Sequence, residues 1–203
     1  MKKAFKGLSA LFMALVLVLA VTACSNNTEK KDENKTETSK NKEEKVDKTA
    51  LGGDLSTFAY DIQVAISKAD APFGTLGSYA GAEGDAYNAQ DVKDAASQVP
   101  NAASAFDNLT VPDSLKDYKD KLDQAISDLK DAFAKRADAA KANGIDSVKD
   151  GAALAKAVDA VSKDSASKTA FDKFQTEYNE VAKDLGLENM DFSKALELPF
   201  AAE

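Results

Sequence analysis

Apolar residues recur at every third or fourth position from about residue 50 onward, which is the spacing of one face of an α-helix. In the first such segment Asp54 is placed to cap a helix, and the apolar positions are Leu55, Phe58, Ile62, Ile66 and Ala69. A second segment carries its apolar positions at Val92, Ala95, Val99, Ala102, Phe106 and Leu109. No window alternates with a period of two and β-branched residues, as a strand would. The pattern therefore predicts an all-α fold.

Two further amphipathic segments follow. The third is the most regular, with leucines seven residues apart at Leu115, Leu122 and Leu129. Thr110 and Asp113 resemble a capping box at its start, and Asn143-Gly144 supplies its stop. The fourth begins at Ser147 with Asp150 and runs to Gly186, with a break expected in the apolar-poor residues 162–169.

Four amphipathic helices with short connections predict an antiparallel bundle over residues 50–203. A domain of this size can bury one hydrophobic core without crosslinks. The tail after Asp191 is too apolar to remain in water, because it contains Phe192, Leu196, Leu198 and Phe200. We expect it to form a short final helix docked across the end of the bundle.

Glycines and prolines leave the shape of the first two helices open. Four glycines are spaced three and four residues apart, at Gly74, Gly77, Gly81 and Gly84. Glycine costs about 1 kcal/mol per helical position relative to alanine, which favours a loop, whereas the spacing would fit one side of a longer helix. Prolines at Pro72 and Pro100 could kink both helices and open a groove, or each could mark a helix end.

The start of the chain has the features of an export signal. Three lysines within the first six residues precede an apolar run over residues 8–20. Val21-Thr22-Ala23-Cys24 then matches the lipobox of bacterial lipoproteins, and Cys24 is the only cysteine of the 203 residues. The resemblance to these lipoproteins implies removal of residues 1–23, a diacylglycerol thioether on Cys24 and further acylation of the new amine.

Two other interpretations of this segment stay open. One is an ordinary secretory signal cleaved near Ala20 or Ala23, which would leave Cys24 as a free thiol. The other is an uncleaved anchor, although the apolar run is shorter than the about 20 residues that span a bilayer. Two or more acyl chains would give stable attachment to membrane lipid. The lysine- and asparagine-rich sequence after Cys24 is typical of Gram-positive lipoproteins, which predicts the extracytoplasmic face of the cell membrane.

Residues 24–49 predict a disordered, charged linker between the lipid and the bundle. After Cys24 they contain seven acids and seven lysines, with Val46 as the only aliphatic residue. Such a segment buries too little apolar surface to offset its ordering entropy, although a helix laced with Glu and Lys pairs is the alternative.

Charge limits the partners. The net charge of −8 becomes −11 without residues 1–23, which carry three lysines and no acid. This acidic chain lacks the basic surface of a nucleic-acid-binding protein, so no nucleic-acid partner is expected.

Residue types exclude most catalytic chemistry. The chain has no histidine, the commonest general base and metal ligand, and its one cysteine is assigned to lipid. No nucleophile elbow or phosphate-binding loop occurs, so we predict no catalytic residues, no metal and no cofactor. The acidic turn from Glu83 to Asp91 lacks the ligand order of a calcium-binding EF-hand and is interpreted as solvated.

Arg136 is the one arginine and the remaining candidate site residue. It follows Leu129 by seven positions and Phe133 by three, which places it on the inward stripe of the third helix. It could pair with an acid inside the bundle or lie in the path of a ligand. Alternatively, its stem could lie on apolar surface with the guanidinium in water.

These features favour a non-catalytic interaction module, tethered to the membrane, that binds a peptide, an envelope protein or a wall polymer. One alternative is a solute-binding lipoprotein that serves a transporter. Another is a cell-wall enzyme that uses carboxylates alone. The sequence does not predict the ligand or the oligomeric state.

Overall fold

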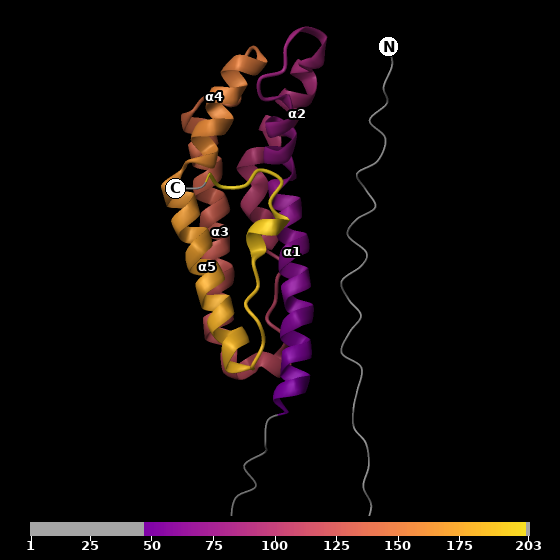
Figure 1. Cartoon of the computed structure of the whole chain (residues 1–203), viewed down its shortest axis with the longest axis vertical. Coiled ribbons are helices and arrows are strands. Elements are labelled where there is room, and N and C mark those ends of the chain that lie inside the picture. The colour runs from indigo at the N-terminus through magenta and orange to yellow at the C-terminus, as the bar shows by residue number, and fades with distance from the viewer. Residues whose placement is uncertain (1–46, 202–203) are drawn as a thin grey trace, which may run out of the picture. The chain divides into compact units, whose positions relative to one another are not determined.

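The computed structural model describes residues 47–201, and all the regular structure in this range is helical, as the sequence predicts (Figure 1). The α-helices are α1 (Lys48–Tyr79), α2 (Ala89–Gln98), α3 (Lys119–Ala142), α4 (Gly151–Ser162) and α5 (Ser165–Asp184). Short 3-10 helices are η1 (Gly84–Ala86), η2 (Val99–Phe106), η3 (Asp113–Tyr118) and η4 (Phe192–Ala195). The signal segment, the lipobox with Cys24 and the linker up to residue 46 lie outside the described residues.

The helices form an antiparallel bundle of four columns (Figure 1). α1 makes the first column, α2 with η2 the second, η3 with α3 the third, and α4 with α5 the fourth. α3 packs against α5, η2 and α4, while α1 packs against η2, α2 and α4. No helix of residues 47–201 is long and apolar enough to cross a membrane.

The first column begins earlier than its apolar stripe indicates. The side chain of Asp47 accepts hydrogen bonds from the backbone N–H groups of Thr49 and Ala50, so Asp47 is the N-cap of α1. The prediction that Asp54 caps this helix is wrong, because Leu51 is buried and extends the apolar face one turn further back.

α1 continues through Pro72, and the glycine-rich segment after it divides in two. Gly74 and Gly77 lie within the helix, while Gly81 lies in the turn after it and Gly84 begins η1, with φ angles of 79° and 54°. Such positive φ values are accessible to glycine at little cost. The first half of the glycine-rich segment therefore forms the longer helix, whereas the second half lies outside α1.

The second and third columns contain more 3-10 helix than the sequence indicates. α2 ends at Gln98 and continues as η2, with Pro100 in its first turn, so Pro100 marks the end of the α-helix. The capping box predicted at Thr110 does not form, because the Thr110 hydroxyl donates to the Asn108 carbonyl and η3 has no side-chain cap. The stop predicted at Asn143-Gly144 is confirmed, since α3 ends at Ala142.

The fourth column breaks where the sequence predicts a break. α4 starts after Asp150, whose carboxylate accepts from the Ala153 N–H at 2.8 Å, and ends at Ser162. α5 starts after Asp164, which accepts from the Ser167 N–H at 2.8 Å. α5 ends at Asp184, just before the predicted stop at Gly186.

The tail does not cross the end of the bundle as expected. We call residues 187–201 the C-terminal strap. It contains η4 and runs back along the molecule between α1 and α5 (Figure 1). Its Ala195 carbonyl lies 3.5 Å from the Ser67 hydroxyl of α1, and its Ala201 N–H donates to the Ser162 carbonyl at 2.8 Å. Because α1 and α5 make few direct contacts, the strap can pack its apolar side chains along the length of the bundle rather than across its end.

Candidate functional site

Arg136 lies on the inner face of α3 and faces an acid of α1. Its Nη1 donates to Asp70 Oδ1 at 2.5 Å, and both side chains have 0% exposure to solvent. The guanidinium is therefore inside the bundle and not at its surface. Taking two charges out of water is costly, and the cost is offset only when the remaining polar atoms of both groups are also hydrogen-bonded.

The strap supplies most of those additional hydrogen bonds, and it does so through its backbone. Asp70 Oδ2 accepts from the N–H of Glu197 and from the N–H of Leu198, the latter at 2.8 Å. Arg136 Nη2 donates to the carbonyl oxygen of Leu198. The acid thus binds the donors of the strap, and the arginine binds its acceptor.

Aromatic rings flank the guanidinium. The carbon Cζ of Arg136 lies 4.6 Å from the ring centroid of Phe73 on α1 and 4.8 Å from that of Phe200 on the strap. Both distances are within the range of cation–π attraction, which strengthens where water is excluded. The Nε of Arg136 is buried and has no hydrogen-bond partner within residues 47–201.

Burial disfavours the charged forms of both groups. Desolvation raises the pKa of the Asp70 carboxyl, although Arg136 and the two strap N–H groups oppose this shift. Desolvation likewise lowers the pKa of the Arg136 guanidinium, against the attraction of Asp70. The pair is stabilised because each charge is the other's partner and the strap backbone hydrogen-bonds both groups.

Asp70 is the functional candidate that the sequence analysis missed. It lies within the apolar stripe of α1, four residues after Ile66 and three before Phe73, both of which are buried. An acid on the buried face of an amphipathic helix is the signal that could have identified it, because an ionised side chain there requires a partner.

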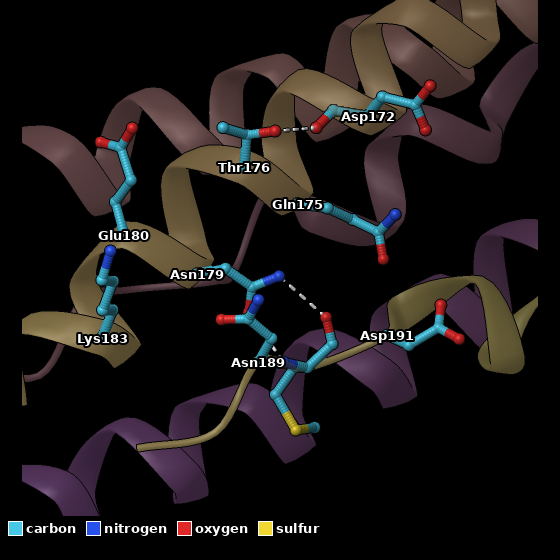
Figure 2. Close-up of a pocket in the computed structure, with 9 residues that line it drawn as sticks. Asp172, Gln175, Thr176, Asn179, Glu180, Lys183, Asn189 and Asp191 are labelled. Atoms are coloured by element: carbon cyan, nitrogen blue, oxygen red, sulfur yellow. Dashed lines mark hydrogen bonds between the residues drawn. The ribbon is translucent and has the colours of Figure 1, made fainter. Parts of the chain in front are cut away.

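α5 also hydrogen-bonds the strap backbone. The Asn179 carboxamide accepts from the N–H of Met190 at 2.7 Å and donates to its carbonyl at 2.9 Å (Figure 2). Gln175 accepts from the N–H of Phe192 at 2.8 Å. We use the name strap site for the four side chains Asp70, Arg136, Gln175 and Asn179. All four bind backbone groups of the C-terminal strap, whose one regular element is η4.

Close backbone approach explains one of the glycines that the sequence singled out. A Cβ atom at Gly74 of α1 would lie 2.1 Å from Glu197 Oε2 and 2.5 Å from Glu197 Cβ. Gly74 therefore allows the strap to lie directly against α1.

Two surface hollows accompany these contacts. One, of about 620 Å³, lies along α5 beside the strap (Figure 2). It is lined by Asp172, Gln175, Thr176, Asn179, Glu180, Lys183, Asn189, Met190 and Asp191. The other, of about 250 Å³, lies between α1 and α2 beside Pro72, and Pro100 does not line it.

Within residues 47–201 no group of three or more metal-ligating side chains could hold a metal ion.

A second charged cluster lies between α3 and α5. Lys173 Nζ lies 2.9 Å from Asp128 and 3.6 Å from Glu177, and Gln124 donates to Asp128 at 3.2 Å. Burial and the neighbouring Asp128 raise the pKa of the Glu177 carboxyl. Burial also acts to raise the pKa of Asp128, but hydrogen bonds from Lys173, Gln124 and Glu177 together with the charge of Lys173 leave it lowered.

We expect Glu177→Gln to raise the free energy of unfolding at neutral pH by up to about 1 kcal/mol. A carboxyl whose pKa is higher in the folded chain stabilises the fold below its unfolded value, near 4.5, and this contribution is lost as pH rises through the folded pKa. The variant should therefore lose less stability than the wild type between about pH 4 and pH 8 in urea unfolding. A steeper loss in the variant would contradict this assignment.

Comparison of the chain with protein-family models, with curated proteins and with solved structures finds no match.

Proposed function

We propose that this protein is a lipid-anchored binding module on the extracytoplasmic face of a bacterial cell membrane, with no catalytic activity of its own. The proposal for the anchor rests on Val21-Thr22-Ala23-Cys24, which follows an export-type segment and contains the only cysteine. Several acyl chains on one residue give stable membrane attachment without a spanning helix.

The observation that carries the binding role is the strap site. Side chains from three helices bind N–H and C=O groups of the C-terminal strap, with Asp70 on α1, Arg136 on α3 and Asn179 on α5. Backbone recognition of this kind is how proteins bind extended polypeptides. The buried charges are engaged with each other and with the strap, which supports binding rather than acid–base chemistry.

The Cys24→Ala variant tests the anchor. In the native host we expect it to move from the membrane fraction to the medium, because the chain has no other thiol that could carry the diacylglycerol. Ser25→Ala is the matched control and should stay with the membrane. Mass spectrometry of the wild type should find acyl chains on Cys24. Retention of Cys24→Ala at the membrane, or an unmodified Cys24 in the native protein, would contradict the proposal.

A further inference from the structure

The strap has two parts that are held differently. The first part, before residue 196, is anchored by Phe192, which is fully buried with its ring centroid 4.8 Å from that of Phe174 and 4.9 Å from that of Tyr178. The second part, residues 196–201, which we call the distal strap, belongs to no helix and begins with an extended backbone at Leu196. The distal strap could therefore leave without unfolding any helix.

The distal strap alternates like a bound peptide. Leu196, Leu198 and Phe200 are half-buried against the bundle, while Glu197 and Pro199 between them are exposed. This period of two is that of an extended chain with one face on a surface. The fit is specific at Phe200, whose ring lies 5.5 Å from that of Phe171 and over the Arg136 guanidinium.

The strongest polar contacts of the distal strap do not depend on its sequence. Asp70 binds two consecutive N–H groups and Arg136 binds one C=O, which any extended polypeptide presents. Asp70 and Arg136 lie 2.5 Å apart, so each would keep the other as its partner and gain water if the distal strap left, and neither would become an unpaired buried charge. Among the described residues, none accepts from the Nε–H of Arg136 while the strap is bound.

We propose that the Asp70–Arg136 half of the strap site binds an extended segment of another polypeptide, with apolar side chains at alternate positions and an aromatic ring at the third of them. The distal strap occupies this site as an intramolecular competitor. This inference deepens the proposed function and rests on its binding role. A partner segment must displace residues 196–201, so its apparent affinity is reduced by the fraction of molecules in which the strap is bound.

A peptide-binding assay tests the proposal. The probe is a fluorescently labelled peptide with the sequence of residues 195–201, Ala-Leu-Glu-Leu-Pro-Phe-Ala, and the readout is fluorescence anisotropy. We expect it to bind an otherwise full-length variant that lacks residues 196–203, and to bind the wild type at least about tenfold more weakly. Asp70→Asn in the shortened variant should weaken binding by about tenfold or more, because it removes the charge from an acceptor of two N–H groups.

Two controls keep the assay decisive. A peptide with serine in place of both Leu198 and Phe200 should bind at least about tenfold more weakly, since it lacks the apolar face. If the shortened variant does not fold, full-length protein with Leu198→Ser and Phe200→Ser, which weakens the strap without removing it, should bind the native peptide more tightly than the wild type does.

Three results would overturn the proposal. These are binding to neither the wild type nor any strap-weakened variant, binding to the shortened variant with none to the wild type at saturating peptide, and an unchanged affinity in Asp70→Asn. The second would mean that the distal strap is a permanent part of the fold. The assay uses purified protein, so its failure would leave the lipid anchor intact, and failure of the Cys24→Ala test would leave the peptide result intact.

Discussion

Arg136→Met is expected to lower the free energy of unfolding by about 3–5 kcal/mol, because it leaves a buried carboxylate without its countercharge. Methionine fills a similar volume but removes the positive charge that faces Asp70 at 2.5 Å. The carboxylate then remains at 0% exposure with only strap N–H groups as partners. The loss also includes the hydrogen bond to the Leu198 carbonyl and the contacts with Phe73 and Phe200. Urea unfolding followed by circular dichroism measures the change.

The double variant Asp70→Leu with Arg136→Met should recover a large part of this loss, because replacing a whole buried pair by apolar residues is far less costly than removing one partner. Lys130→Met is the matched control. It breaks an exposed pair, in which Lys130 and Asp107 are 2.6 Å apart, and should cost no more than about 1 kcal/mol. Equal losses in Lys130→Met and Arg136→Met would show that burial of the Asp70–Arg136 pair is not what stabilises the fold.

Gly151→Ala is expected to cost about 1–3 kcal/mol, because the added methyl group meets backbone rather than a flexible side chain. A Cβ atom at Gly151 would lie 2.1 Å from the carbonyl oxygen of Ala82 and 2.6 Å from its nitrogen. The same contact holds the start of α4 against the loop after α1, where the Gly81 N–H donates to the Gly151 carbonyl at 2.7 Å. Thermal unfolding should show a lower midpoint for this variant.

Gly53→Ala is the matched control for Gly151→Ala. Gly53 lies in the first turns of α1, and a Cβ atom there would meet nothing within 4 Å. Since alanine has the higher helix propensity and no clash, this variant should be more stable than the wild type by about 0.5–1 kcal/mol. A stabilising Gly151→Ala, or a destabilising Gly53→Ala, would contradict the packing described for these two positions.

The helical stripes were predictable because burial imposes a period that is visible in one sequence. The 3-10 segments were not, since six to eight residues at three per turn differ little from the same residues at 3.6 per turn. The start of α1 was misplaced for a related reason. Asp47 and Asp54 are both residues that could cap the helix. Asp47 is the N-cap because Leu51 is buried and belongs to the apolar face of α1.

The candidate site was predictable in one residue and not in its geometry. The inward stripe of the third helix placed Arg136, but its partner Asp70 lies 66 residues earlier, and no local pattern joins them. The strap was recognisably apolar, yet its path depends on α1 and α5 making few direct contacts. Asp70 contacts the backbone N–H groups of Glu197 and Leu198. Because almost every residue carries such a group, the sequence does not predict these contacts.

Amide hydrogen exchange at Glu197 and Leu198, followed by NMR in the full-length protein, tests the central claim that the buried pair holds the strap. Both residues lie outside helices, so their amides would exchange freely unless Asp70 accepts from them. We expect exchange at least about a hundredfold slower than in an unstructured peptide, with most of this protection lost in Asp70→Asn. Exchange of both wild-type amides at the rate of an unstructured peptide would contradict the account.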